Sequence, residues 1–379
     1  MQFTPRPYQA PAIKFLLDTP KAGLFLDVGL GKSACTSVVI QTTLLACEVH
    51  HWLIVAPLKV CQTTWPSEFA KWDHLQGITV NHLWGLNEAA RMEAAGKRAD
   101  VTVINYDQLV WLIKFWGKKW PYRGVVLDEA SKVKDAGTKR WKGLRSVLPY
   151  IERLIELTGS PVAQGYLGLW AQVYLLDHGA ALGRTMGGYK LAFFTPDFHG
   201  YKWTPKEGAT EIIENSIRHL CMTMRAVDHL DIPPILDNVI EVPLPAPAAK
   251  QYAEMEKASV LRLKGMVITA VNAGVVTGKL SQIANGVIYH TNQSEEHGEY
   301  TVLHEAKFEA LSDLIDSMNG TPFLLAYWFQ SDKARLRARF DTEVLEFFDG
   351  SKEQMARWQQ KKIPVLAVHP QSGGHGVDG

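Results

Sequence analysis

Five short apolar runs in the first 160 residues constrain the fold more than any other feature of this chain. Each run ends in a polar or glycine-containing loop, and segments of helical length lie between them. The runs occupy residues 22–28, 52–57, 101–105, 124–128 and 154–158. Short apolar strands that alternate with helices are typical of a parallel sheet covered on both faces. We therefore expect an α/β domain here.

The chain changes character after residue 170. Residues 170–235 contain helical stretches and an aromatic, glycine-rich segment without a clear period, so we expect a helical or irregular insertion there. Three prolines at 243, 245 and 247 cannot continue a helix or a central strand, which indicates a linker at residues 236–250. The prediction is a first lobe at residues 1–235 and a second at 251–379.

The second lobe returns to strand and helix alternation. Strands are expected at residues 323–329, 344–348 and 364–368, with charged helices between them. One of these helices contains Lys333, Arg335, Arg337 and Arg339. A spacing of two scatters side chains around a helix, so we interpret this cluster as part of a solvated surface rather than a binding site.

Composition limits the function classes. The 379 residues leave room for two domains, and the 46% hydrophobic and 21% charged residues are typical of globular proteins. Lys plus Arg total 40 against 39 Asp plus Glu, so any basic surface must be local. The four cysteines lack zinc-finger or disulfide spacing, and no apolar run approaches the roughly 20 residues that span a bilayer. We expect a soluble cytoplasmic protein without a membrane partner.

The sequence LFLDVGLGKS predicts a strand that runs into a phosphate-binding loop and then a helix. The loop consists of Gly29, Leu30, Gly31, Lys32 and Ser33. Glycines let backbone N–H groups approach phosphates, the lysine neutralises the β- and γ-phosphates, and the serine hydroxyl can ligate Mg²⁺. Leu26 replaces the first glycine of the full pattern, so a chance match in a glycine-rich turn is the alternative.

Two carboxylates follow another expected strand. Asp128 and Glu129 come directly after the run that ends at residue 127. Beside a phosphate loop, Asp128 would hold Mg²⁺ and Glu129 would polarise the attacking water as a general base. Without the Lys32 loop, such a pair would be interpreted as a solvated loop.

The order of motifs resembles that of superfamily 2 helicase-like ATPases, and within them the SNF2 group. The motifs are RPYQ, DVGLGKS, IVAPLKV, INYD, LDEAS and LTGSP, followed by AYWF and HPQSGGHG. The segments KLSQIANGVIY and LHEAKFEAL are similar to those of SNF2-like bacteriophage proteins, which would place the protein in the host cytoplasm. The resemblance covers nearly the whole chain. It implies two RecA-like lobes, ATP and Mg²⁺ as cofactors, and DNA as partner, with duplex DNA favoured.

The resemblance also implies roles for single residues at the nucleotide. Gln9 would read the adenine edge, because an amide both donates and accepts hydrogen bonds, with Arg6 or Tyr8 nearby. Gly376 in the fifth motif would bring a backbone amide to the nucleotide or to DNA. Other residues match motifs that contact the nucleic-acid backbone or couple it to ATP. They are Pro57, Leu58, Lys59 and Asn105 for DNA, and Thr158, Gly159 and Ser160 for coupling. Plain loops at strand ends are the alternative for both groups.

A local basic stretch follows the carboxylate motif. Between residues 132 and 145 there are six basic residues and one acidic residue: Lys132, Lys134, Lys139, Arg140, Lys142 and Arg145 against Asp135. Phosphate contacts need charge without base specificity, so we expect DNA at Lys132, Lys134, Lys139 and Arg140. A solvated charged face is the alternative.

The resemblance includes a sixth motif whose arginines reach the γ-phosphate. Here the sequence ends at VDG after the fifth motif, and its last arginine, Arg357, precedes that motif. A truncated sequence, a missing part that is provided otherwise, or a weak ATPase would each account for this. We expect a second lobe truncated after the fifth motif, without its final strands, and little turnover. The function expected is a DNA-dependent ATPase that moves on DNA. The alternatives are a strand-separating helicase and a nucleotide-sensing DNA-binding module.

Overall fold

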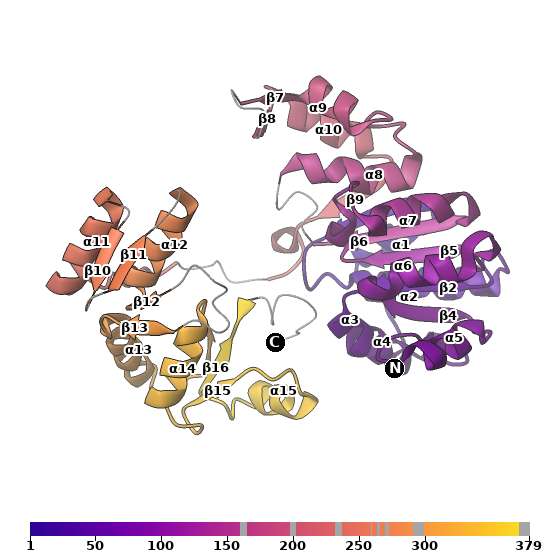
Figure 1. Cartoon of the computed structure of the whole chain (residues 1–379). Helices are drawn as coiled ribbons and strands as arrows, with labels where there is room; N and C mark the ends of the chain where they lie inside the picture. The colour runs from indigo at the N-terminus through magenta and orange to yellow at the C-terminus, as the bar shows by residue number, and fades with distance from the viewer. Residues whose placement is uncertain are drawn as a thin grey trace. The chain divides into compact units, whose positions relative to one another are not determined.

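The computed structural model describes residues 1–159, 165–197, 202–231, 237–258, 260–263, 266–269, 273–290 and 299–370. The chain divides into two compact units, Met1–Pro234 and Ile235–Gly379 (Figure 1). Within the described part of the chain, every helix is too short or too polar to cross a bilayer. The positions Ser160 and Gly376, which the sequence pointed to, lie outside the described residues.

The first unit is built on a seven-stranded sheet with the order β3-β4-β2-β5-β6-β1-β9. All of its pairings are parallel. The strands are β1 (Lys21–Leu26), β2 (Trp52–Ala56), β3 (Val80–His82), β4 (Val101–Asn105), β5 (Gly124–Asp128), β6 (Arg153–Thr158) and β9 (Cys221–Met224). The five expected strands are present, and the predicted α/β class is confirmed.

Helices cover both faces of this sheet, because successive strand residues point to opposite sides. Leu154 of β6 belongs to one apolar cluster and its neighbour Ile155 to the other. The cluster of Ile155 is covered by α1 (Gln9–Asp18), α2 (Lys32–Leu45), α3 (Leu58–Gln62) and α4 (Thr64–Lys71). The cluster of Leu154 is covered by α5 (Glu88–Gly96), α6 (Tyr106–Trp116), α7 (Lys139–Val147) and α8 (Leu169–Asp177).

Between α8 and β9 the chain leaves the sheet and then returns to it. It forms α9 (Met186–Phe193), an antiparallel hairpin of β7 (Phe194–Pro196) and β8 (Trp203–Pro205), and α10 (Ala209–Ile217). β9 then pairs with the free side of β1. Short 3-10 turns complete the unit: η1 (Asp73–Leu75), η2 (Gly117–Lys119), η3 (Ala130–Val133), η4 (Leu148–Tyr150), η5 (Tyr166–Gly168) and η6 (Ala226–Asp228).

The second unit combines a helical part with a small parallel sheet. The helical part contains α11 (Ala246–Ala258), the β10 (Val260–Leu263) and β11 (Met266–Thr269) hairpin, α12 (Ala273–Ala284), and the β12 (Val287–Tyr289) and β13 (Tyr300–Val302) hairpin. The sheet has the order β14-β16-β15, formed by β14 (Phe323–Ala326), β15 (Leu345–Phe347) and β16 (Val365–Val368). Its helices are α13 (Ala306–Ser317), α14 (Gln330–Arg339) and α15 (Lys352–Gln359).

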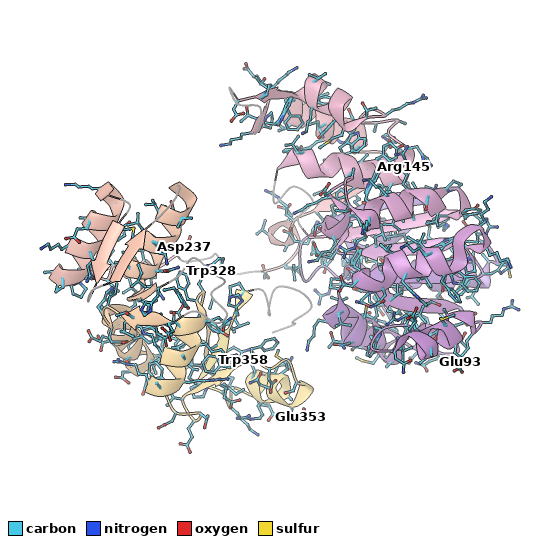
Figure 2. The ribbon with its side chains drawn as sticks, in the orientation of Figure 1. Glu93, Arg145, Asp237, Trp328, Glu353 and Trp358 are labelled. Atoms are coloured by element: carbon cyan, nitrogen blue, oxygen red, sulfur yellow. The ribbon has the colours of Figure 1, made fainter. Side chains whose placement is uncertain are left out.

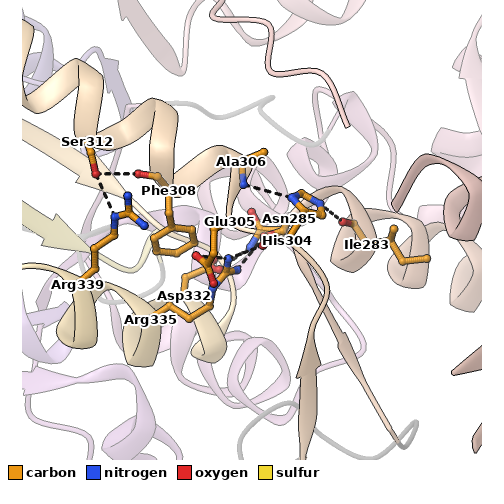
Figure 3. A network of polar contacts seen from close by, with 10 residues as sticks. All are labelled: Ile283, Asn285, His304, Glu305, Ala306, Phe308, Ser312, Asp332, Arg335 and Arg339. Carbon is orange, nitrogen blue, oxygen red and sulfur yellow. Dashed lines mark hydrogen bonds and ion pairs between the residues drawn. The ribbon is translucent and has the colours of Figure 1, made fainter. Parts of the chain in front are cut away.

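A buried arginine joins the two parts of the second unit (Figure 3). Arg335 of α14 is only 8% exposed, so interpreting its whole cluster as solvated was wrong at this position. Its guanidinium donates to the carbonyl oxygens of Asn285 and His304, each at 2.9 Å, and to Glu305 Oε2 at 2.8 Å. It also lies 4.0 Å from the centre of the Phe308 ring. One side chain thus connects α14 with the end of α12 and the start of α13.

We predict that Arg335→Met unfolds the second unit at markedly lower denaturant. The substitution keeps much of the volume but leaves the half-exposed carboxylate of Glu305 and two part-buried carbonyls without their donor. Leaving a buried acceptor without its donor costs about 1 to 3 kcal/mol. Urea unfolding followed by circular dichroism measures this. Arg339→Met on the same helix is the matched control, because Arg339 is exposed and bonds only Ser312 among the contacts in Figure 3. Equal effects of the two variants would contradict the prediction.

A buried carboxyl group lies in the first unit without a hydrogen-bond partner among the described residues. Glu156 of β6 is 0% exposed, and neither side-chain oxygen has a partner there. Its neighbours two positions away along the strand are Leu154 and Thr158, which are also buried. Burial raises the pKa of Glu156 well above its usual range. The folded protein therefore keeps a proton on this group at a pH where the unfolded chain has released it.

We predict that Glu156 makes the first unit less stable as the pH rises. Above the ordinary glutamate pKa, unfolding releases the proton, so the free energy of unfolding falls by up to about 1.4 kcal/mol per pH unit until the folded-state pKa is passed. Glu156→Gln has no proton to release and should not show this slope. Thermal unfolding of both proteins between about pH 5 and pH 8 tests the sign. Parallel pH profiles would refute the assignment.

Candidate nucleotide site and its surroundings

Three loops meet at the carboxyl-terminal ends of the strands in the first sheet. β5, β6 and β1 are neighbours in the sheet and run parallel, so the loops that follow them emerge at the same end of the sheet. They contain the phosphate loop, the Asp128 and Glu129 pair, and Thr158 with Gly159. A Cβ atom at Gly159 would lie 3.6 Å from the carbonyl oxygen of Leu26, which shows how closely two of these loops approach. Motifs that are far apart in the sequence thus lie together in one compact site.

The phosphate loop turns through two glycines in the left-handed region. Gly29 has φ 87° and Gly31 has φ 77°, and Lys32 begins α2 directly after them. The Lys32 ammonium donates to the carbonyl oxygens of Leu26 at 2.6 Å and Asp27 at 3.2 Å. Burial lowers its pKa, while Asp128, Glu129 and Asp27 oppose that shift. These carboxylates therefore lie close enough to Lys32 to share one electrostatic site.

Gln9 packs directly against this loop. Its Oε1 accepts from the backbone N–H of Arg6 at 2.9 Å, and its Nε2 donates to the carbonyl oxygen of Leu30 at 3.2 Å. Since an amide has two donor and two acceptor positions, one of each is left over for a base edge. The Leu30 side chain is fully buried, so this predicted nucleotide residue could contribute only backbone atoms. Arg6 is exposed and reaches the hydroxyl of Tyr8 at 3.4 Å.

A tryptophan from α4 holds the first carboxylate. Trp65 is fully buried, and its indole N–H donates to Asp128 Oδ2 at 3.0 Å. Burial raises the pKa of Asp128 to about 6, against the opposing effects of Trp65 and Lys32. The N–H group fixes one oxygen of the carboxylate and leaves the other for a ligand. Sequence reasoning missed Trp65, whose only signal was its place in an amphipathic helix.

Glu129 is held by three elements. Its backbone is left-handed with φ 62°, a conformation that costs a non-glycine residue on the order of 1 to 3 kcal/mol. Its carboxylate accepts from the hydroxyl of Ser131 and, at 3.5 Å, from that of Thr158. The Tyr106 hydroxyl donates to the Glu129 carbonyl oxygen at 3.3 Å. The ends of β4, β5 and β6 therefore jointly orient the candidate general base.

The donor set near Asp128 fits magnesium bound together with a nucleotide. Among the described residues, no group of three or more His, Cys, Asp or Glu side chains could hold a metal by itself. Mg²⁺ usually keeps several waters and takes one or two carboxylates plus phosphate oxygens. Asp128 and the Ser33 hydroxyl at the start of α2 match that mode.

The candidate nucleic-acid residues lie at the end of β4 and in the segments that follow β2 and β5, with Lys139 and Arg140 at the start of α7. Leu58 is exposed and Pro57 and Lys59 are half-buried at the start of α3, while Lys132 and Lys139 are exposed and Lys134 is half-buried. Asn105 is buried, and its amide donates to Asp107 at 3.4 Å. This set therefore contains exposed lysines and one buried residue, Asn105, whose amide already bonds Asp107 nearby.

Arg140 has partners within the protein. It donates to Asp107 Oδ1 at 3.2 Å and to the Lys132 carbonyl oxygen at 3.3 Å, and its guanidinium lies 5.0 Å from the Tyr106 ring centre. Arg145, which is labelled in Figure 2, is also on α7. Its guanidinium lies over the rings of Trp141 and Tyr174. Arg140 therefore links α7 and η3 to the start of α6, which carries Tyr106.

Known proteins with a similar sequence or fold indicate the family of this chain. No family model matches the chain. It is 35% identical over 386 residues to protein p41 of Acyrthosiphon pisum secondary endosymbiont phage 1, an alignment that covers 99% of this chain and 83% of the relative. It is 31% identical over 201 residues to the Mus musculus DNA excision repair protein ERCC-6-like, and 31% identical over 185 residues to helicase SWR1 of Candida glabrata.

The last two alignments cover 50% and 46% of this chain but only 16% and 12% of those relatives. Among solved structures, the Sulfolobus solfataricus SWI2/SNF2 ATPase core in complex with dsDNA matches with a TM-score of 0.52 and 20% identity, covering 97% of this chain and 78% of that one. That likeness concerns the fold. Motif order, fold and relatives agree, and the chain belongs to the SNF2 group of superfamily 2 helicase-like proteins.

Proposed function

We propose that this protein is a DNA-dependent ATPase that couples ATP hydrolysis to movement on DNA. The observation that carries the proposal is the meeting of Lys32, Asp128 and Glu129 at the ends of neighbouring parallel strands, each oriented by other residues. The relatives named for helicase and DNA repair functions, and the fold match to an ATPase core in complex with dsDNA, support it. Duplex DNA is the partner we favour.

In the proposed mechanism the first unit supplies the groups that bind and hydrolyse ATP. Gln9 reads the adenine edge with its remaining donor and acceptor, and the loop from Gly29 to Ser33 binds the phosphates through backbone N–H groups. Lys32 exchanges its carbonyl partners for the β- and γ-phosphates. Mg²⁺, held by Asp128 and Ser33, would neutralise charge on those phosphates. Glu129 takes a proton from the attacking water.

Hydrogen bonds connect the candidate DNA surface with the general base. Arg140 and Asn105 both donate hydrogen bonds to Asp107. The residue before Asp107 is Tyr106, whose hydroxyl donates to the Glu129 carbonyl oxygen. DNA phosphates that compete for Arg140 would change its contact with Asp107 and with the Tyr106 ring. Because the Glu129 backbone is strained, a small shift of Tyr106 would reorient its carboxylate. We infer that DNA stimulates hydrolysis through this contact.

Lys32→Ala and Glu129→Gln test the site. Lys32→Ala should abolish ATP binding, because the phosphates lose their main cation. Glu129→Gln should keep ATP binding but lower hydrolysis by about 100-fold or more, the usual contribution of a general base. Phosphate release with and without duplex DNA, together with calorimetric ATP binding, separates the two effects. Glu93→Gln, at an exposed pair with Lys97 on α5, is the control.

Wild-type rates in either site variant would refute the assignment. ATP binding without any turnover in the wild-type protein would instead favour a nucleotide-sensing module. Strand displacement from a labelled duplex would favour a helicase.

Trp65→Phe tests the support of Asp128. Phenylalanine keeps most of the buried ring but removes the N–H that bonds the carboxylate. Groups that orient metal ligands typically contribute 10- to 100-fold to metal affinity or activity, so we expect Mg²⁺-dependent hydrolysis to fall by about tenfold. Trp72→Phe is a matched control, because the Trp72 indole also donates to a carboxylate, Glu68 at 2.6 Å, away from the three loops of the site. An equal loss in both variants would contradict this role.

A further inference from the structure

A short segment after β9 lies beside the phosphate loop for a reason set by sheet register. β9 pairs with β1 so that Met224 lies opposite Leu26, and the Asp27 N–H donates to the Met224 carbonyl oxygen at 3.1 Å. Both strands then end together. The residues that follow β9 must therefore pass next to the loop that follows β1. We call residues 226–230 the strap.

The strap is a turn that is bonded to Asp27 at its start and packs beside Gly29 of the phosphate loop at its end. The N–H of Ala226 donates to Asp27 Oδ2 at 2.8 Å, and the N–H of Leu230 closes the turn on the Ala226 carbonyl oxygen at 2.9 Å. The Leu230 side chain packs against the apolar cluster on that face and would lie 3.9 Å from a Cβ atom at Gly29. The strap is thus held at both ends by residues of, or adjoining, the candidate phosphate site.

The strap presents a ring next to the base-reading residue. His229 stacks on Tyr8 with ring centres 5.1 Å apart and planes 28° from parallel. Tyr8 is only 8% exposed and precedes Gln9, and the His229 ring stacks on its ring. His229 is exposed and carries Tyr8 on one face. Among the described aromatic contacts, His229 makes only this one.

We propose that His229 is a base-stacking residue of the nucleotide site, which receives the purine ring on the face turned away from Tyr8. The inference rests on the proposed ATP site. Phosphates bound at Gly29 to Ser33 and a base edge bound by Gln9 would bring the base to the neighbourhood of Tyr8, where the exposed ring belongs to His229. An aromatic surface attracts any base, and the larger purine covers more of it than a pyrimidine does. His229 thereby favours purine over pyrimidine nucleotides.

Calorimetric titrations with ADP, CDP and inorganic tripolyphosphate test this, each in the presence of Mg²⁺. His229→Ala should weaken ADP binding by about tenfold and CDP binding by less, because the stacking surface is lost. Tripolyphosphate has no base, so its affinity should not change. His229→Phe keeps a ring and should retain ADP affinity to within a few-fold. His219→Ala, at an exposed histidine just before β9, is the control for the general effect of losing a surface imidazole.

The outcomes separate the two proposals. If wild-type protein does not bind ADP, or if Lys32→Ala does not weaken tripolyphosphate binding, the ATP site itself is refuted. If wild-type protein binds ADP and Lys32→Ala weakens tripolyphosphate binding, but His229→Ala binds ADP as tightly as wild type, only the stacking role is overturned. It is also overturned if His229→Phe loses as much affinity as His229→Ala, or if tripolyphosphate weakens in parallel, since His229 would then only support the shape of the loop.

Discussion

The parallel pairing of β5, β6 and β1 is the constraint on which the candidate site depends. Each of these strands ends in a loop with a different chemical group, and the parallel register brings the three loops to the same end of the sheet. No single loop could bind and hydrolyse a nucleotide. Lys32 supplies positive charge but is not a general base, and Glu129 is a candidate general base but supplies no positive charge. The buried strands fix the positions of the three loops relative to one another, so that separate motifs form one site.

The sequence predicted most of this sheet because buried parallel strands are continuous apolar runs. It did not indicate β3 or β9. β3 has three half-buried residues at one edge, and β9 carries the alternating sequence CMTM at the other. Edge strands bury less surface, so their apolar signal is weak. β9 is nevertheless important, because its register positions residues 226–230 beside the phosphate loop.

The candidate site divides in a similar way. Lys32, Asp128 and Glu129 could be named as candidates from the sequence because each lies in a local motif with a known chemical use. Trp65 was missed because its hydrogen bond to Asp128 joins residues 63 positions apart, and no local pattern encodes such a contact. Arg335 shows the opposite error: a spacing of two suggested a solvated helix, yet tertiary partners bury this one member.

Gly31 ties the two ends of the candidate nucleotide site together. Its left-handed backbone favours glycine, and a Cβ atom there would lie 2.4 Å from Gln9 Nε2. Any larger residue would therefore displace the Gln9 amide, the proposed base-reading group, while it distorts the turn of the proposed phosphate loop. Under the proposed function, a side chain at position 31 would impair base and phosphate recognition together, whereas a change at Gln9 alone would act on the base.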